Sequence, residues 1–193
     1  MRAPSAKRTL DLAGSLLLLV VLAPLLAAAA AVVAFTSPGG VLLRQTRAGL
    51  NGAPFELLKF RTVTRTTSRT MSHAVSPTTP AGRLLRRFSL DELPQLINVV
   101  RGEMSLVGPR PLPVADAGHR GAARGRLIVP PGITGLWQVN RHPEMPWNEM
   151  VLVDLEYVDR HWLGLDLAIL ARTLPTVLTP RPARTTHTAH PAH

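Results

Sequence analysis

The chain has no cysteine, a single tyrosine and only 4% aromatic residues among its 193 residues. Without cysteine it cannot form disulfide bonds, use a thiol nucleophile or hold a metal through thiolates, although this absence does not fix its compartment. Acidic residues are also scarce, with 12 Asp and Glu against 22 Lys and Arg. The formal net charge of +10 suits an anionic partner: a phosphorylated small molecule, an acidic membrane surface or a nucleic acid.

A nucleic-acid partner is suggested only by this charge. The basic residues are not interleaved with aromatic ones, and the sequence has neither a helix-turn-helix pattern nor a zinc-ligand spacing. We therefore predict that the protein does not bind nucleic acid. The length suits one domain with a modest core.

One long uncharged segment, Leu12 to Leu43, lies near the N-terminus and has its apolar centre at Leu16 to Phe35. Such a segment favours membrane insertion. A cleaved signal peptide is the alternative, because Ala27 to Ala31 resembles a small-residue cleavage region. Pro24 would kink or break a helix here. Each half then keeps about a dozen apolar residues, roughly 18 Å of helix, which is shorter than a bilayer core of about 30 Å.

Basic residues flank both ends of this segment. They are Arg2, Lys7 and Arg8 before it, and Arg44, Arg47, Lys59 and Arg61 after it. The positive-inside tendency places both ends on the cytoplasmic face. A re-entrant helix that bends at Pro24 satisfies both constraints, and a single kinked spanning helix is the alternative. We predict a membrane-embedded region at 1–43, a folded domain at 44–179 and a disordered tail at 180–193.

A β-hairpin is predicted after the apolar segment. Asn51-Gly52 is a strong turn signal, because both residues tolerate positive φ. Phe55 to Thr62 alternates well enough to be the return strand. Lys59 and Arg61 would then share one face of that strand. They are either a solvated edge or ligands for phosphate.

The middle of the chain predicts a loop followed by a short basic helix. Thr64 to Thr79 is rich in Ser and Thr, contains no acidic residue and has little apolar periodicity, so we predict a mobile loop. Ala81 to Arg87 predicts a short helix that carries Arg83, Arg86 and Arg87. These arginines suit either a phosphate ligand or a basic face against anionic lipid.

Two longer helices are predicted near the C-terminus, at Trp147 to Arg160 and at Trp162 to Leu178. The second is strongly apolar and suits an interfacial position on a bilayer. Trp137 to Asn140 follows a stretch of prolines and glycines that disfavours a helix, so we predict a short strand there. The tail histidines are attributed to composition rather than to a metal site. Together these elements predict an α+β, mainly helical fold with a re-entrant membrane helix, a small β-hairpin and interfacial amphipathic helices.

The segment Ser89 to Val100 carries the strongest helix-start signal in the chain. Ser89 and Glu92 have the spacing of a capping box. An apolar face is predicted to enter the core, and it consists of Leu90, Leu93, Ile97 and Val100. The acidic pair Asp91-Glu92 is explained by this start alone, because carboxylates in the first turn of a helix gain about 0.3–1 kcal/mol from the macrodipole.

The same pair also has a functional interpretation. A helix N-terminus and many arginines keep Asp91 ionised, as a nucleophile or a metal ligand must be. Two adjacent carboxylates with phosphate oxygens suit Mg²⁺. Cations could neutralise charge on a phosphoryl group, and the candidates are Lys59, Arg86 and Arg110. Arg110 lies between Pro109 and Pro111, which stiffen its backbone for bidentate binding.

These motifs resemble those of a known family, the bacterial sugar transferases, which are monotopic phosphoglycosyl transferases that use polyprenyl phosphate. The resemblance is to the small type that has the catalytic domain only, and it covers the chain from about Lys7 to Leu178. Its most specific segments are Lys59-Phe60-Arg61-Thr62, Ser89-Leu90-Asp91-Glu92-Leu93-Pro94-Gln95-Leu96, Met104-Ser105-Leu106-Val107-Gly108-Pro109-Arg110-Pro111 and Pro131-Gly132-Ile133-Thr134-Gly135.

The resemblance implies transfer of a sugar-1-phosphate from a UDP-sugar to undecaprenyl phosphate, with Mg²⁺, at the start of exopolysaccharide or glycoconjugate synthesis. It implies that Asp91 is the nucleophile, which forms an aspartyl-phosphosugar intermediate, and that Glu92 is its partner in metal binding or in activating the acceptor. The implied substrate-binding and phosphate-binding residues are Lys59, Arg61, Arg86, Arg110, Gln138, Asn140 and Arg141. It also implies a location at the inner (cytoplasmic) membrane, with the catalytic domain facing the cytoplasm.

The chain departs from the family pattern at three places that bear on these expectations. Ala23 precedes Pro24, where the family usually has serine, and the loop Thr64 to Thr79 lacks the family's usual aspartates. Trp137 replaces a smaller usual residue, a change that bears on the choice of donor. The loop motivates a second hypothesis, a membrane-bound binding or scaffold protein that keeps the fold without turnover.

Overall fold

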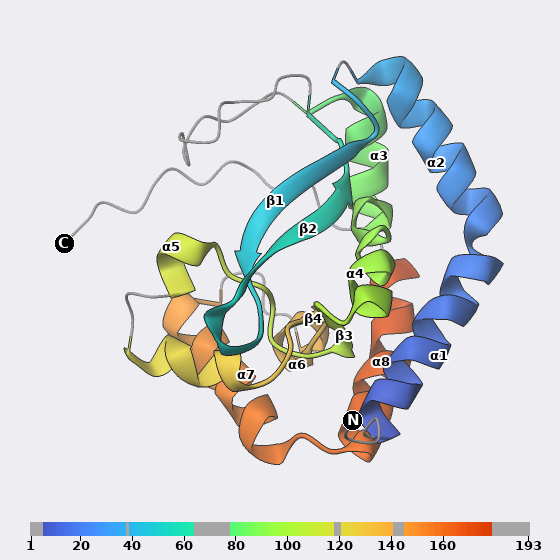
Figure 1. Cartoon of the computed structure of the whole chain (residues 1–193). Coiled ribbons are helices and arrows are strands. Elements are labelled where there is room, and N and C mark those ends of the chain that lie inside the picture. The colour runs from blue at the N-terminus through green and yellow to red at the C-terminus, as the bar shows by residue number, and fades with distance from the viewer. Residues whose placement is uncertain (1–5, 38, 64–77, 118–120, 141–144, 179–193) are drawn as a thin grey trace.

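The computed structural model describes residues 6–37, 39–63, 78–117, 121–140 and 145–178. Helices dominate, and the strands form two small two-stranded sheets (Figure 1). The elements in chain order are α1 (Ala6–Val21), α2 (Ala23–Thr36), β1 (Leu42–Ala48), the 3₁₀ turn η1 (Leu50–Gly52), β2 (Pro54–Phe60), α3 (Pro80–Arg87), the 3₁₀ turn η2 (Leu90–Glu92), α4 (Gln95–Arg101), β3 (Ser105–Val107), α5 (Val114–Ala117), the 3₁₀ segment η3 (Gly121–Ile128), β4 (Gly132–Thr134), α6 (Leu136–Val139), α7 (Trp147–Arg160) and α8 (Leu163–Leu178).

The apolar N-terminal segment forms two helices rather than one. α1 and α2 meet at a break where their axes bend by 65°, and Pro24 lies in the first turn of α2, where a proline is tolerated. Among the described residues, no single helix is both long and apolar enough to cross a bilayer, whereas the bent pair passes that test together. The expected break near Pro24 is therefore confirmed.

The predicted hairpin is present. β1 and β2 pair antiparallel, with Leu43 opposite Lys59 and Arg47 opposite Phe55. Asn51 and Gly52 at its tip have φ of 54° and 80°, in the left-handed region that the turn signal requires. The other sheet is a short parallel pair of β3 and β4, which the sequence pattern did not indicate.

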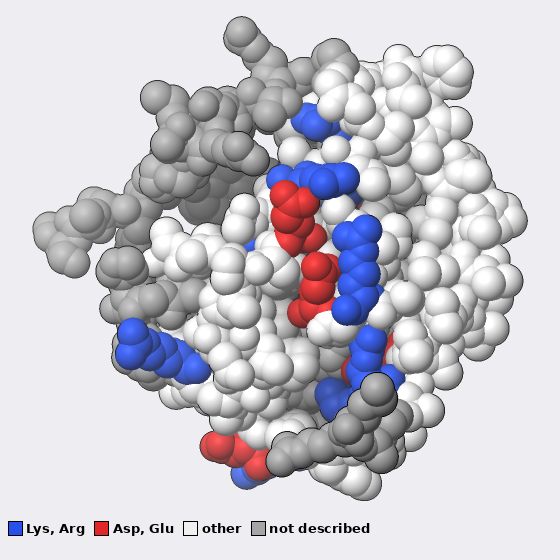
Figure 2. All heavy atoms as spheres, in the orientation of Figure 1, with Lys and Arg blue, Asp and Glu red and all other residues white. Residues whose placement is uncertain are grey.

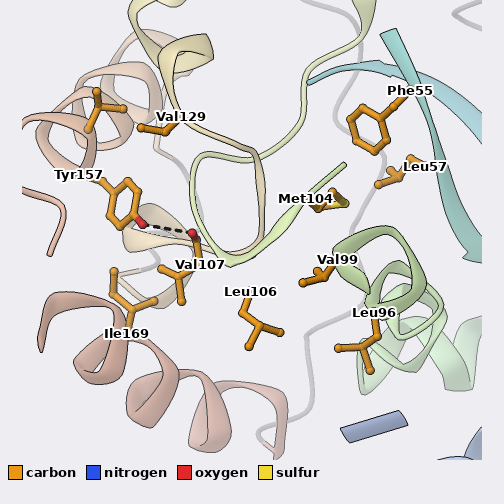
Figure 3. Close-up of a cluster of buried hydrophobic side chains, with 11 residues drawn as sticks. Phe55, Leu57, Leu96, Val99, Met104, Leu106, Val107, Val129, Tyr157 and Ile169 are labelled. Carbon is orange, nitrogen blue, oxygen red and sulfur yellow. Dashed lines mark hydrogen bonds between the residues drawn. The ribbon is translucent and has the colours of Figure 1, made fainter. Parts of the chain in front are cut away.

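The main core lies where the hairpin, α4, β3, α7 and α8 meet (Figure 3). Its buried members are Phe55, Leu57, Leu96, Val99, Met104, Leu106, Val107, Val129, Tyr157, Val158 and Ile169. A smaller cluster joins α2 to the hairpin and α3 through Ala29, Val33, Phe60 and Leu85. Leu10 and Leu19 of α1 pack against the main core, so both helices of the bent pair are packed onto the domain.

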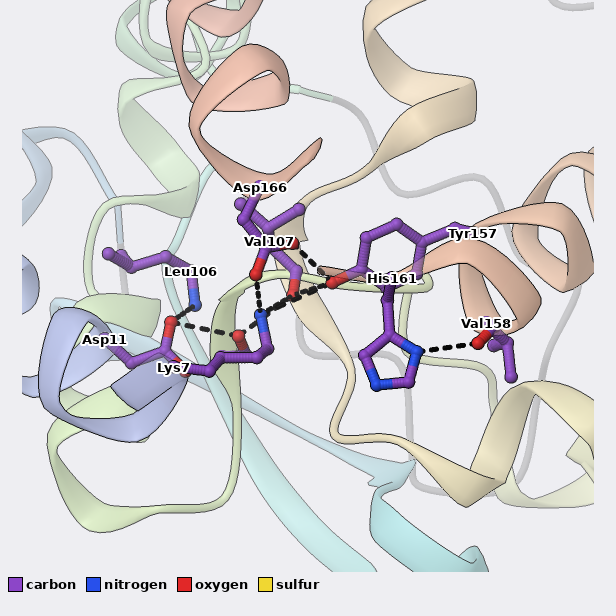
Figure 4. A network of polar contacts seen from close by, with 9 residues as sticks. Lys7, Asp11, Leu106, Val107, Tyr157, Val158, His161 and Asp166 are labelled. Carbon is purple, nitrogen blue, oxygen red and sulfur yellow. Dashed lines mark hydrogen bonds and ion pairs between the residues drawn. The ribbon is translucent and has the colours of Figure 1, made fainter. Parts of the chain in front are cut away.

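Charged side chains of α1 fix that helix to the rest of the fold (Figure 4). Lys7 Nζ lies 2.7 Å from Asp166 Oδ2 on α8 and also donates to the Val107 carbonyl. Asp11 Oδ1 accepts the Leu106 N–H at 2.9 Å and the Ser105 hydroxyl at 3.0 Å. Burial is the largest of the causes that raise the pKa of Tyr157, whose hydroxyl donates to Asp166.

Two sequence predictions about local structure are wrong. Residues 89–100 form a 3₁₀ turn followed by α4 instead of one helix, and the fully buried apolar residues of α4 are Leu96 and Val99. The predicted face is only partly buried; it consists of Leu90, Leu93, Ile97 and Val100. The expected strand at Trp137 to Asn140 is the short helix α6, and the strand lies just before it, at β4.

The helices predicted near the C-terminus are confirmed as α7 and α8, and the short basic helix is confirmed as α3. Thr79 caps α3, because its side chain accepts the Gly82 N–H at 2.9 Å. Most of the predicted loop, residues 64–77, and the predicted tail lie outside the described residues.

Candidate active site

The acidic pair lies in the tight turn η2, which begins at Ser89. Ser89 has φ of 58° and ψ of 17°, the left-handed conformation, and its side chain makes no capping hydrogen bond. The capping-box prediction is therefore wrong. Pro94 is the N-cap of α4. Because proline has no backbone N–H, it is tolerated at a helix start but could not donate a hydrogen bond within a helix that began earlier. The reversal at Ser89 leaves both carboxylates outside the helix and turned into the domain, with Asp91 and Glu92 each 8% exposed.

Glu92 is held between two cations. Its Oε1 accepts one bond from Lys59 Nζ and one from Arg110 Nη2, each at 2.9 Å. Burial alone would raise the pKa of Glu92, but the charges of Arg110 and Lys59 and their hydrogen bonds outweigh it and lower the pKa to about 2. Glu92 is therefore ionised at neutral pH, and its charge in turn raises the pKa of Arg110.

Asp91 belongs to the same charged cluster. Its carboxylate is close enough to Arg110 to contribute to that residue's raised pKa. The turn η2 that carries it packs between α3 and β2. Two carboxylates and two cations from β2, η2 and the Pro-Arg-Pro segment therefore converge at one place.

A buried ion pair holds the backbone of Arg110 in place. Arg126 Nη2 donates to the Arg110 carbonyl at 3.1 Å and is also paired with Asp154 on α7. Both side chains are almost inaccessible, and the Arg126 guanidinium lies 5.6 Å above the Trp147 ring. Burial is the main cause that raises the pKa of Asp154 to about 6, although Arg126 opposes it. The pair fixes the point from which the Arg110 side chain reaches Glu92.

The remaining predicted site residues have other contacts in the structure. Arg61 Nε donates to the Gly40 carbonyl at the junction of α2 and β1. Arg86 Nε donates to Thr62 Oγ1 at 2.8 Å. Gln138 is buried in α6 and donates to the Ile133 carbonyl, whereas Asn140 is exposed at the end of that helix. Arg141 lies outside the described residues.

The carboxylate pair has the chemistry of a partial magnesium site. Within the described residues, no group of three or more His, Asp or Glu side chains is placed to hold a metal ion. Mg²⁺ commonly binds through one or two carboxylates and completes its shell with water and substrate phosphates. Asp91 and Glu92 fit that mode, in which the ion is shared with a bound phosphate.

Charged residues that support this site were not identified from the sequence. Arg126 and Asp154 are 28 positions apart and belong to segments that gave no motif. Asn98 is fully buried, where its side chain accepts the Leu58 N–H at 3.0 Å and donates to the Glu56 carbonyl at 2.7 Å. Asn98, with Val99, follows the Ser89 to Leu96 segment as part of the family resemblance, but the sequence did not indicate its structural role, which is to fix α4 to the strand that carries Lys59.

Comparison with known proteins identifies the class of this chain. The profile of the bacterial sugar transferase family matches residues 2–180. A UDP-glucose:undecaprenyl-phosphate glucose-1-phosphate transferase of Caulobacter vibrioides is 41% identical over 186 residues, covering 90% of this chain and 70% of the relative. The exopolysaccharide production protein ExoY of Sinorhizobium fredii is 34% identical over 196 residues, covering 91% of this chain and 87% of that protein.

A third relative, an undecaprenyl-phosphate glucose phosphotransferase of Komagataeibacter xylinus, is 42% identical over 189 residues, covering 87% of this chain and 35% of its own length. These matches make the chain an enzyme of the sugar transferase class. It belongs to the bacterial sugar transferase family.

Proposed function

We propose that this enzyme transfers a sugar-1-phosphate from a UDP-sugar to undecaprenyl phosphate and releases UMP, as a first step of exopolysaccharide or glycoconjugate synthesis. The observation that carries the proposal is the buried pair Asp91-Glu92, held against Lys59 and Arg110. The names of the relatives in Caulobacter and Komagataeibacter support the donor and acceptor, and ExoY supports the pathway.

Asp91 is the nucleophile in this proposal. Its carboxylate oxygen attacks the β-phosphorus of the donor, and the bond from that phosphorus to the bridging oxygen breaks, so that UMP leaves. An oxygen of the lipid phosphate then attacks the phosphorus of the aspartyl-phosphosugar, which frees the Asp91 carboxylate and gives the lipid diphosphosugar. Lys59 and Arg110 stabilise charge on the phosphoryl oxygens in both steps, because preorganised cations in a partly buried site require little reorganisation.

Asp91 and Glu92 would hold Mg²⁺ together with donor phosphate oxygens. When bound, the ion neutralises phosphate charge. Glu92 suits this role because its pKa of about 2 keeps it ionised and because both cations contact the same oxygen, Oε1.

We also propose that α1 and α2 are a re-entrant element in the inner membrane and that the site faces the cytoplasm. Apolar side chains on these helices are exposed, including Leu17 at 63%, Val20 at 73% and Phe35 at 90%. Figure 2 shows charged side chains in the middle of the face, over the hairpin and α4, whereas the surface over α2 carries none in the same view. An exposed apolar helix pair whose surface carries no charge in this view is the kind of surface that contacts a membrane.

The test is UMP release from a panel of UDP-sugars by the full chain in detergent, with undecaprenyl phosphate and Mg²⁺. Asp91→Asn should reduce the rate by at least about a thousandfold, because it removes the nucleophile. Asp159→Asn changes an exposed acidic residue on α7 and should leave the rate unchanged. If the wild type equals Asp91→Asn at background with every donor, the scaffold hypothesis is favoured and the enzyme proposal fails.

A further inference from the structure

A small hollow lies beside the charged cluster, between β1, β2, α4 and the Pro-Arg-Pro segment. It is lined by Arg47, Leu57, Lys59, Gln95, Arg110 and Pro111 and has a volume of about 30 Å³. One water needs roughly 10–15 Å³ by this measure, so the hollow holds two or three oxygen-sized groups. A phosphate monoester has three free oxygens, which is the upper end of that range.

The lining of the hollow is strongly cationic. Of the described residues that line it, three are basic and none is acidic. Glu92, which pairs with Lys59 and Arg110, offsets one of the three charges. Arg47 is partly buried at the end of β1, where its backbone bridges to Pro113 and its Nη2 donates to Gln45 Oε1 at 3.1 Å. Partly buried cations around a hollow of this size favour a compact anion.

Gln95 adds a polar group to the lining of the hollow. The residue is 3% exposed, and among the described residues its side-chain amide makes no hydrogen bond. Its amide atoms are not themselves enclosed by protein, so they are available to a ligand or to water in the hollow. The N–H₂ group of a carboxamide is a donor that suits a phosphate oxygen.

We propose that Arg47 and Gln95, together with Lys59 and Arg110, form a binding subsite for a phosphate monoester next to Asp91. The inference rests on the proposed function for its ligands, which are the phosphate that leaves as UMP and the phosphate of the lipid acceptor. Both are phosphate monoesters. Arg47 and Gln95 bind this group, and Lys59 and Arg110 are shared between it and Glu92.

The same strand offers a matched control. Arg44 is also a β1 arginine, but its side chain is 68% exposed, pairs with Glu56 and does not line the hollow. Replacing it removes the same charge from the same strand without touching the subsite.

The experiment titrates the detergent-solubilised full chain with three probes: UMP, inorganic phosphate and a short-chain polyprenyl phosphate. The variants are Arg47→Gln, Gln95→Leu, Gln95→Glu and the control Arg44→Gln. We expect Arg47→Gln to raise the Kd of at least one phosphate monoester by about tenfold or more, because a charge-assisted bond is lost. Gln95→Glu should weaken binding more than Gln95→Leu, because it adds a negative charge of nearly the same shape. Arg44→Gln should leave every Kd unchanged.

The two sources of the phosphate are separated by the probes. A loss confined to UMP assigns the subsite to the donor, and a loss confined to the polyprenyl phosphate assigns it to the acceptor. Arg47→Lys keeps the charge but loses the planar guanidinium, so its Kd should lie between those of wild type and Arg47→Gln, which distinguishes lost binding from misfolding. Equal Kd values for wild type, Arg47→Gln and Gln95→Glu with all three probes would overturn the inference, as would the absence of any binding by the wild type. These outcomes are independent of UMP release, whose absence contradicts the proposed function alone.

Discussion

Glu92 carries the most sharply defined electrostatic interaction in the site. Glu92→Gln should lower the free energy of unfolding at pH 7 by about 2–3 kcal/mol, because it leaves Lys59 and Arg110 without their shared counter-ion. This expected loss is smaller than the loss for a fully buried ion pair, because the Arg110 side chain is 38% exposed. Thermal unfolding in detergent measures the difference, and Glu156→Gln, which breaks an exposed pair with Arg160, should cost less than about 0.5 kcal/mol.

The lowered pKa of Glu92 also predicts how the stability lost in Glu92→Gln should depend on pH. The folded-state pKa of Glu92, about 2, lies below its ordinary value of 4.5, so its stabilisation is fully present above pH 4.5. That stabilisation is lost as the pH falls through about 2. The difference in the free energy of unfolding between wild type and Glu92→Gln should therefore be constant from pH 7 to about pH 5 and should become smaller below that. A constant gap down to pH 3 would contradict the assigned pKa.

A substitution at Ser89 tests whether this residue caps a helix or only adopts a left-handed backbone conformation. Its φ of 58° is a left-handed conformation that costs a non-glycine residue about 1–2 kcal/mol, and no capping bond compensates. Ser89→Gly should therefore raise stability, by up to about 1 kcal/mol after the entropy of the unfolded glycine is counted. A cap would predict a loss instead. Asn51→Gly, at the other positive-φ residue, should change stability in the same direction but by less, because asparagine tolerates this region.

At the scale of elements, the parallel pair β3 and β4 holds the Pro-Arg-Pro segment in place through a close backbone approach. A Cβ on Gly132 would lie 2.1 Å from the Gly108 nitrogen and 2.4 Å from the Thr134 carbonyl oxygen, and neither backbone atom can move aside cheaply. Gly132→Ala should destabilise the protein by several kcal/mol, more than the 1–3 kcal/mol typical of overpacking, and should abolish activity. Gly14→Ala, whose Cβ would meet only the flexible end of Leu106 at 2.9 Å, should be tolerated. Unfolding midpoints and UMP release measure both effects.

The sequence predicted those elements in which local signals agree with the tertiary structure. α7 was predicted with the bounds Trp147–Arg160, because its helical periodicity and its burial coincide. The prediction of one helix over residues 89–100 was wrong because two signals competed there. The spacing of Ser89 and Glu92 is typical of a cap, but the bonds that Lys59 and Arg110 offer Glu92 are stronger than a capping bond, and Pro94 starts the helix late.

The candidate site was predicted in part for a similar reason. Lys59, Asp91, Glu92 and Arg110 lie in recognisable motifs, and the structure brings them together. The pair Arg126–Asp154 is a contact between two segments that pack only in the folded chain, so no spacing rule could join them. The parallel strands β3 and β4 have three residues each, too few for an alternation to be detected.

At the scale of the whole molecule, the polar contacts of α1 tie the apolar helix pair to the active site. Arg8 donates to the Val99 and Val100 carbonyls, so it occupies the C-terminal end of α4, the helix that follows the acidic pair. Asp11 bonds β3, the strand that leads to the Pro-Arg-Pro segment. A lipid phosphate that enters along α1 would therefore meet a site whose position is set by the same helix.

The proposed re-entrant arrangement predicts that both ends of the bent pair lie on the same side of the membrane, and this chain is well suited to test that prediction. It has no cysteine, so single cysteines can be introduced without a background. Thr9→Cys, in the first turn of α1, and Arg44→Cys, in β1 after α2, place exposed thiols near the two ends of the bent pair. If α1 and α2 enter and leave on one face, an impermeant maleimide should label both positions in inverted membrane vesicles and neither in intact spheroplasts. Labelling of one position from each side would show that the pair spans the bilayer despite its 65° bend, because only a spanning segment separates its two ends.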